Sequence, residues 1–286
     1  MPRANSKFYN FRTRVWHKIL RRPIHLKAAY DSKLKNPKLT VVFLHGISAT
    51  SDTWRTTIRQ FSKNPDLKDV RFIALDLLGF GVSLQSTWLD YDYDDYDRAL
   101  DAALRRLKVE GPVVLVGHSM GSLIAADYAT NYQSSFDIVH LILVSPPVLM
   151  SEELAKLPDK VYTKSYGSLH RLANDEPVME VIANFIQRFS SFSSKYIKTP
   201  AFGRSMDNII LNHKNYRTFT KIKVPTLIIH GHFDPLVMRS NLKHVAEVNS
   251  KYVRFVSVMG HHDVSAQKRS KMLIELKKVL REEKAK

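Results

Sequence analysis

A serine between two glycines forms the most distinctive motif of this chain. Residues 117–121 read Gly-His-Ser-Met-Gly, with the apolar run 113–116 before them and the helix-like stretch 122–126 after them. A G-x-S-x-G motif between a strand and a helix predicts a tight turn that presents the serine hydroxyl above the end of a sheet. The two glycines leave room for neighbouring backbone where a β-carbon would crowd. We therefore predict that Ser119 is a nucleophile, the alternative being an ordinary strand–turn–helix connection.

A serine nucleophile needs a general base and an acidic residue that orients this base. Asp234 follows the run 224–231, which reads as a buried strand ending in a turn. It thus lies at the carboxyl end of a strand, where open α/β sheets bind ligands, and this position favours the orienting role over a simple turn aspartate. His261 and His262 follow the next strand-like run, 252–258, and one of them is expected to be the base.

Acyl transfer also requires two backbone N–H groups that point at the developing oxyanion. The residue after the nucleophile, Met120, is expected to supply one of them. The second is expected from Ile47, in the loop that follows the strand-like run 41–44. Gly46 permits the sharp turn of this loop, and His45 is expected to shape the loop rather than to transfer protons.

Together these residues resemble the α/β-hydrolase family over about residues 24–284. The matching motifs are 45–46, 76–83, 117–121, 230–234 and 260–262. The resemblance implies an α/β fold, with a mostly parallel twisted sheet, helices on both faces and a helical cap insertion. It also implies a Ser-Asp-His triad. In the family the catalytic histidine precedes the apolar stripe of the last helix by a fixed short distance, which favours His262 over His261.

Composition and periodicity agree with one catalytic α/β domain. The chain has 286 residues, of which 44% are hydrophobic, enough for a substantial core. Strand-like runs alternate with helix-like stretches, a pattern typical of a parallel sheet covered on both faces. Strands are expected at 39–44, 71–76, 113–116, 138–144, 226–230 and 252–258, and helices near 51–62, 94–108, 120–131, 238–247 and 265–283. The expected units are an N-terminal helix at 1–23, the core at 24–145 and 217–286, and a cap at 146–216.

The cap assignment follows from a break in this alternation and from the position of insertions in the family. Helix-like pieces are expected at 176–189 and 205–211. Apolar side chains of this region are candidates for an acyl pocket, or else they pack a small core of the cap itself. They are Met179, Phe185, Phe189, Phe192, Tyr196, Phe202 and Met206.

The positive charge is concentrated near the N-terminus. The net charge is +17, and residues 1–40 carry eleven Lys or Arg against one acid, which gives +10 of that total. Phe8, Phe11, Val15 and Ile19 recur at helical spacing, which predicts a basic amphipathic helix. We consider two alternatives: residues 1–22 contact an anionic membrane surface, or the apolar stripe docks on the domain. Nucleic-acid binding is not expected, because no reading module accompanies the charge.

Neither a metal nor a cofactor is predicted. The acidic segment 90–97 lacks the glycine and the glutamate of a calcium loop and is better explained as the start of a helix. The chain has no cysteine, no apolar run of about 18 residues and no continuous apolar core after its basic N-terminus. We therefore expect a cytoplasmic location, and the alternative is a cytoplasmic protein in peripheral contact with a membrane.

These observations predict a serine hydrolase that cleaves a small carboxylic ester, with an apolar acyl group, through an acyl-enzyme intermediate. Other activities of the same fold are alternatives: C–C bond hydrolysis, aminopeptidase activity and cofactor-free haloperoxidase-type activity. A ligand-binding protein without catalysis is a further alternative, because fold alone does not determine function.

Overall fold

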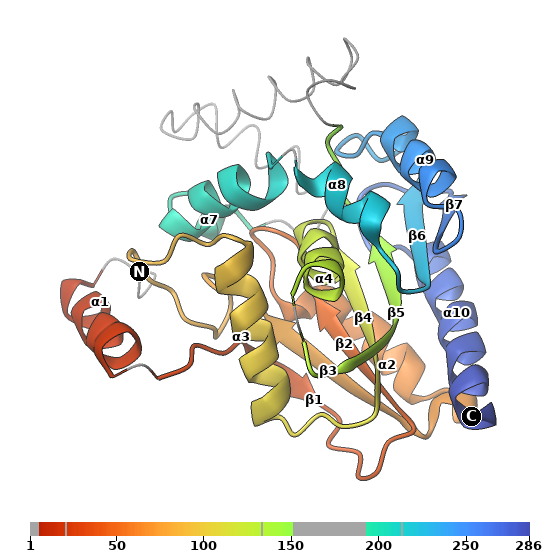
Figure 1. Ribbon diagram of the computed structural model, residues 1–286, viewed down its shortest axis with the longest axis horizontal. Helices are drawn as coiled ribbons and strands as arrows, with labels where there is room; N and C mark the ends of the chain where they lie inside the picture. The colour runs from red at the N-terminus through yellow and green to blue at the C-terminus, as the bar shows by residue number, and fades with distance from the viewer. Residues whose placement is uncertain (1–5, 21, 133, 151–192, 213) are drawn as a thin grey trace.

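A seven-stranded sheet runs through the protein, as the computed structural model in Figure 1 shows. The structure describes all residues except 1–5, 21, 133, 151–192 and 213. The strands are β1 Lys27–Asp31, β2 Leu39–Leu44, β3 Val70–Asp76, β4 Pro112–His118, β5 Asp137–Val144, β6 Thr226–Gly231 and β7 Val253–Val258. They lie in the order β1-β3-β2-β4-β5-β6-β7, in which β1 pairs antiparallel with β3 and the other neighbours pair in parallel.

Helices cover both faces of this sheet, because parallel strands must bury both of their faces. The α-helices are α1 Lys7–Arg14, α2 Arg55–Ser62, α3 Tyr93–Arg106, α4 Met120–Thr130, α7 Pro200–Ser205, α8 Lys214–Lys221, α9 Arg239–Val248 and α10 Ala266–Ala285. Shorter helical segments are η2 Val15–Ile19, η3 Ser51–Trp54, η4 Pro65–Leu67, η6 Ser194–Tyr196 and η7 Met206–Ile210. Side chains of α3, α4, α8 and α9 join the hydrophobic cluster on one face, and those of α2 and α10 join the cluster on the other.

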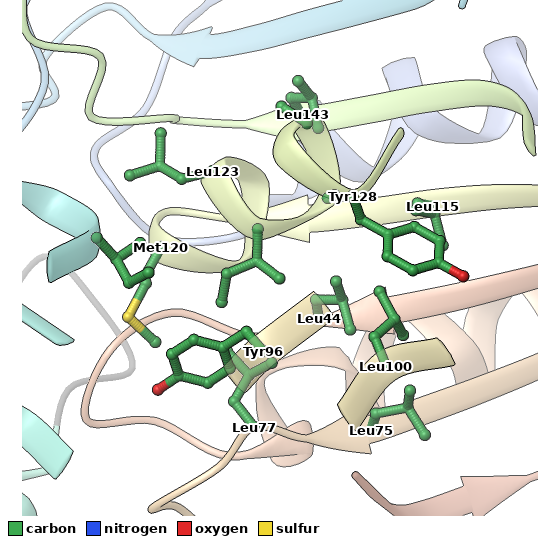
Figure 2. Close-up of a cluster of buried hydrophobic side chains, with 14 of the residues drawn as sticks. Leu44, Leu75, Leu77, Tyr96, Leu100, Leu115, Met120, Leu123, Tyr128 and Leu143 are labelled. Atoms are coloured by element: carbon green, nitrogen blue, oxygen red, sulfur yellow. The ribbon is translucent and has the colours of Figure 1, made fainter. Parts of the chain in front are cut away.

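Strand β2 illustrates how the sequence builds the two clusters. All six of its residues are buried, and they alternate between the faces of the sheet. Val42 and Leu44 contribute to the cluster with α3 and α4, part of which Figure 2 shows. Leu39, Val41 and Phe43 contribute to the cluster with α2 and α10. A strand that is buried along its whole length, with apolar residues at five of its six positions, is typical of the interior of a layered α/β structure.

The predicted fold class is confirmed, and the predicted strands and helices of the core correspond to β2–β7 and to α2, α3, α4, α9 and α10. Strand β1 was not predicted, because three of its five residues are exposed and no apolar alternation marks it. The expected boundary between residues 216 and 217 falls inside α8. The expected helix at 176–189 lies outside the described residues, and the one at 205–211 corresponds to η7.

The acidic segment before α3 is used to start that helix, as predicted. Asp92 is the N-cap residue and accepts a hydrogen bond from the backbone N–H of Asp95 at 2.9 Å. The carboxylate of Asp95 accepts from the N–H groups of Asp90 and Tyr91 at 3.0 and 2.9 Å. The absence of a bound metal remains a prediction from the sequence.

A buried carboxylate joins the last helix to the sheet. Glu275 of α10 lies 2.5 Å from the guanidinium of Arg254 in β7 and 3.1 Å from Nε2 of His140 in β5. Burial by itself raises the pKa of Glu275, but the hydrogen bonds and charges of His140 and Arg254 outweigh it and lower the pKa to about 2. This carboxylate therefore stabilises the folded state at neutral pH.

Replacing Glu275 by Gln should lower the free energy of unfolding by about 2 kcal/mol at pH 7. The wild-type advantage is fully present above the ordinary glutamate pKa and disappears as the pH falls towards 2, where the folded-state carboxylate takes up its proton. Urea denaturation of both proteins at pH 7, 5 and 3 measures this difference. A difference that does not change with pH would show that packing, and not the charge of Glu275, is responsible.

Candidate active site

Ser119 occupies the turn between β4 and α4, since β4 ends at His118 and α4 begins at Met120. Its φ of 52° and ψ of −122° are unfavourable for a residue with a side chain. Hydrogen bonds fix the turn: Ser119 N–H donates to the Val144 carbonyl, and Ser122 N–H donates to the Ser119 carbonyl, both at 2.9 Å. The structure thus holds Ser119 in a strained backbone conformation at the carboxyl edge of the sheet.

The glycines of the motif are explained by close packing of backbone. A β-carbon on Gly117 would lie 2.4 Å from the carbonyl oxygen of Gly121, and one on Gly121 would lie 2.4 Å from the carbonyl oxygen of Leu44. Both distances are far below van der Waals contact, so larger residues cannot occupy these positions without moving the backbone. The glycines therefore allow the start of α4 to pack closely against the ends of β4 and β2.

The structure brings together Asp234 and His262, which follow the neighbouring strands β6 and β7. Nδ1 of His262 lies 2.9 and 3.0 Å from the two carboxylate oxygens of Asp234, and both residues are buried. A carboxylate only accepts hydrogen bonds, so Nδ1 carries the proton of this bond and Nε2 is the other nitrogen of the ring. His261 is exposed, and its Nδ1 lies 3.1 Å from the Phe233 carbonyl oxygen. His262, and not its neighbour, therefore makes the pair with Asp234.

A second histidine connects the loop of His262 to the turn of Ser119. Nε2 of His118 donates a hydrogen bond to the His262 carbonyl oxygen at 2.7 Å, and the two rings are 4.9 Å apart. Burial, helped by the neighbouring His262, lowers the pKa of His118 well below its ordinary value, so this ring is neutral. Since His118 directly precedes Ser119, this bond holds the histidine loop beside the serine turn.

A buried lysine also forms hydrogen bonds with the loop that contains His262. Nζ of Lys268, in α10, donates to the carbonyl oxygens of His261 and Asp263 at 2.6 and 2.8 Å and to Oγ of Ser145 at 3.0 Å. Lys268 has no exposed surface, and burial lowers its pKa to about 8. Sequence reasoning missed this residue, although it lies four positions before Met272 on the buried stripe of the last helix.

These neighbours set the charge of Asp234. Burial by itself raises the pKa of this carboxyl, but the charge and hydrogen bond of His262, a hydrogen bond from Ser145 and the charge of Lys268 act against it. The net result is a pKa well below the ordinary value, so Asp234 is ionised at neutral pH. An ionised carboxylate at this place can orient His262 and stabilise its protonated form.

The loop after β2 lies against the serine. A β-carbon on Gly46 would lie 3.1 Å from Cβ of Ser119, so the backbone that leads into Ile47 passes next to the hydroxyl-bearing side chain. Met120 begins α4, and the first N–H groups of a helix have no partner within the helix. The two predicted oxyanion donors, Ile47 and Met120, thus belong to segments that adjoin Ser119.

His45 shapes this loop. Its Nδ1 donates to the Gly46 carbonyl oxygen at 2.7 Å, and its Nε2 accepts from the Leu77 N–H at 2.9 Å. Burial lowers the pKa of His45, so the ring is neutral and both nitrogens are engaged. This geometry fits the structural role expected for His45 and leaves no nitrogen for proton transfer.

Three of the side chains considered for the acyl pocket pack into the core of the domain. Tyr196, Phe202 and Met206 are buried in the same cluster as α3 and α4. The hydroxyl of Tyr196 accepts a hydrogen bond from the Gly81 N–H at 3.0 Å, and its ring packs edge-on against Phe80. The other four candidates, Met179, Phe185, Phe189 and Phe192, lie outside the described residues.

Comparison with known proteins agrees with this architecture. Residues 40–168 match a family model described as alpha/beta hydrolase fold. The AB hydrolase superfamily protein YisY of Bacillus subtilis is 27% identical over 204 residues, which cover 68% of this chain and 74% of that protein. Human monoacylglycerol lipase ABHD6 is 24% identical over 259 residues, 83% of this chain and 75% of that protein.

Solved structures show the same fold. The esterase EaEST of Exiguobacterium antarcticum superposes with a TM-score of 0.69 at 20% identity, over 91% of this chain and 100% of that one. MenH of S. aureus superposes with a TM-score of 0.66 at 22% identity, over 91% and 99% of the two chains. The chain therefore has the α/β-hydrolase fold, and part of its sequence is similar to that family.

The lowered pKa of Lys268 has a consequence for stability that can be measured against Lys268→Met. Between pH 8 and the ordinary lysine pKa of 10.5, the unfolded chain holds this proton and the folded protein does not. The free energy of unfolding of wild type should therefore rise by up to about 3 kcal/mol relative to the variant as the pH increases through this window. The exposed Lys271, replaced by Met, is the matched control and should show no such change. Parallel curves for wild type and Lys268→Met would contradict a lowered pKa.

Proposed function

We propose that the protein is a serine esterase that cleaves carboxylic esters through an acyl-enzyme intermediate. One observation carries the proposal: His262 and Asp234 form a buried pair at 2.9 and 3.0 Å, and the His262 carbonyl is hydrogen-bonded to His118, the residue before a strained serine. A nucleophile, an orienting carboxylate and a base, which follow one another in the chain in this order, are the components of acyl transfer by serine.

In the first step, Oγ of Ser119 attacks the ester carbonyl carbon while Nε2 of His262 takes the hydroxyl proton. The imidazolium that forms is stabilised by the ionised Asp234 at its Nδ1 side. The N–H groups of Ile47 and Met120 stabilise the oxyanion of the tetrahedral intermediate, at about 3 kcal/mol for each donor. The intermediate collapses when His262 returns its proton to the leaving alcohol, and the acyl group stays on Ser119.

In the second step, a water molecule takes the place of the alcohol. His262 removes a proton from the water as the oxygen attacks the acyl carbon. The second tetrahedral intermediate then expels Ser119, which regains its proton from His262, and the carboxylic acid is released. The net reaction consumes one ester and one water and yields one acid and one alcohol.

Esters are the proposed substrates rather than other acyl compounds because of the relatives. A relative named monoacylglycerol lipase and a structural neighbour named esterase fit the hydrolysis of small esters. The proposed apolar acyl group has two supports. One is the set of apolar side chains at residues 151–192, which lie outside the described residues. The other is the similarity to the lipase and the esterase. The cytoplasmic location likewise stays a prediction.

Replacing Ser119 by Ala should reduce kcat for p-nitrophenyl butyrate by about 10⁴-fold or more. His262→Ala should cause a loss of similar size, and the double variant should be little worse than either, because the two residues act as a unit. The matched control is His261→Ala, which removes an exposed neighbouring imidazole and should retain activity within about tenfold of wild type. Steady-state kinetics on p-nitrophenyl esters of C2 to C12 acids measures these effects and sizes the acyl site.

Other results would redirect the assignment. Full activity in Ser119→Ala would remove the serine mechanism altogether. If wild type hydrolyses none of these esters, the remaining candidates are the C–C hydrolase, aminopeptidase, haloperoxidase-type and binding functions. Labelling by a fluorophosphonate in wild type but not in Ser119→Ala would then separate a serine enzyme with another substrate from a binding protein.

A further inference from the structure

The N-terminal helix contacts the domain through its polar side chains. Oδ1 of Asn10, in α1, accepts hydrogen bonds from the Thr87 N–H at 2.8 Å and from the Ser86 hydroxyl at 3.0 Å. Oγ1 of Thr13, the buried residue of α1, accepts from the indole N–H of Trp88 at 3.0 Å. The helix is therefore fixed to the segment between β3 and α3 without burying an apolar stripe.

Five large apolar side chains of α1, of η2 and of the residue that follows them are exposed. Phe8, Phe11, Trp16, Ile19 and Leu20 are 74, 68, 51, 69 and 53% exposed. One of the two alternatives from the sequence, a helix that docks its apolar stripe on the domain, is therefore wrong. Figure 1 shows α1 at the periphery, away from the sheet and its covering helices. Five large apolar side chains gathered on one exposed helix form an uncovered apolar surface, which on a folded protein marks an interaction site.

Positive charge surrounds this surface. Lys7, Arg12, Arg14, Lys18 and Arg22 are exposed, and the first acidic residue of the chain is Asp31. Beneath the helix lies a groove of about 480 Å³, which combines cationic and apolar side chains. Among the residues that line it are Arg12, Trp16, His25, Lys27 and Val82. The exposed surface of α1 and η2 is thus both apolar and cationic.

We propose that this face docks on the surface of an anionic lipid bilayer. Phe8, Phe11 and Ile19 enter the boundary between headgroups and acyl chains, and the surrounding lysines and arginines contact the lipid phosphates. Within the described parts of the chain, no helix has the length and apolar character needed to cross a bilayer. This inference does not depend on the esterase proposal.

A lipid surface fits these side chains better than other partners do. A second copy of this chain would bring two strongly positive faces together, which like-charge repulsion opposes. A nucleic acid would pair with the cations but would leave the exposed aromatic and aliphatic side chains in water. An anionic bilayer offers negative headgroups and an apolar layer at the same place, and so accounts for both features.

Co-sedimentation of the full chain with extruded vesicles tests the proposal. We expect binding to vesicles that contain about 30% phosphatidylglycerol and much weaker binding to pure phosphatidylcholine. Since each basic residue near the surface contributes about a fivefold factor, Lys7→Gln/Arg14→Gln/Lys18→Gln should bind about a hundredfold more weakly. Phe8→Ala/Phe11→Ala/Ile19→Ala should also lose at least about tenfold, because insertion of apolar area adds to the electrostatic attraction.

Matched controls replace exposed residues elsewhere. Val248→Ala/Ile274→Ala removes side chains that are 54 and 60% exposed on α9 and α10, and should bind like wild type. The fluorescence of Trp16 should shift to shorter wavelength on anionic vesicles, and Trp16→Phe should remove this shift. All these variants should hydrolyse a soluble ester as wild type does, so failure of vesicle binding and failure of the esterase proposal are separable.

Three results would overturn the proposal. Equal binding to neutral and anionic vesicles would remove the role of the charges. Unchanged binding of the apolar triple variant would reduce the contact to electrostatics alone. Absence of vesicle binding together with a dimer in light scattering, lost in the apolar triple variant, would make this face a contact between two copies of the chain.

Discussion

The close approach of α4 to the ends of β4 and β2 is the constraint on which the candidate site depends. It exists because Gly117 and Gly121 present no β-carbon to backbone atoms that would otherwise lie 2.4 Å away. With this contact made, a single residue must connect strand and helix, and Ser119 takes up the unfavourable left-handed conformation that this requires. The packing of the surrounding core holds the strain, and it also brings the loop of Gly46 against the serine.

The histidine side of the site is held by buried polar groups rather than by apolar packing. His118 donates a hydrogen bond to the carbonyl of His262, and Lys268 donates to the carbonyls of His261 and Asp263, which flank His262 in the chain. A buried ammonium is costly, which its lowered pKa expresses, yet each of its hydrogen bonds fixes a group of the loop. Such a network limits where the imidazole can lie, and accurate placement is a large part of what catalysis requires.

Motif and order in the sequence were enough to predict the parts of the site, because a nucleophile turn and strand ends have strong local signals. Ser119 and Asp234 were recognised by their position just after the end of a buried strand. Strand β1 could not be predicted, because an exposed edge strand carries no apolar alternation. The role of Lys268 could not be predicted, because a charged residue in a helix is normally assigned to the face that contacts solvent. The periodicity of α1 identified the residues that share its apolar face, but only the structure shows that the opposite face is docked.

Trapping of the acyl-enzyme tests the central claim most directly. Wild-type protein is mixed with p-nitrophenyl butyrate, quenched in acid during turnover and analysed by intact and peptide mass spectrometry. The account predicts a single butyryl group on the peptide that contains Ser119, with its amount rising and then decaying as the ester is consumed. Turnover without any adduct, or an adduct on another residue, would contradict nucleophilic attack by this serine.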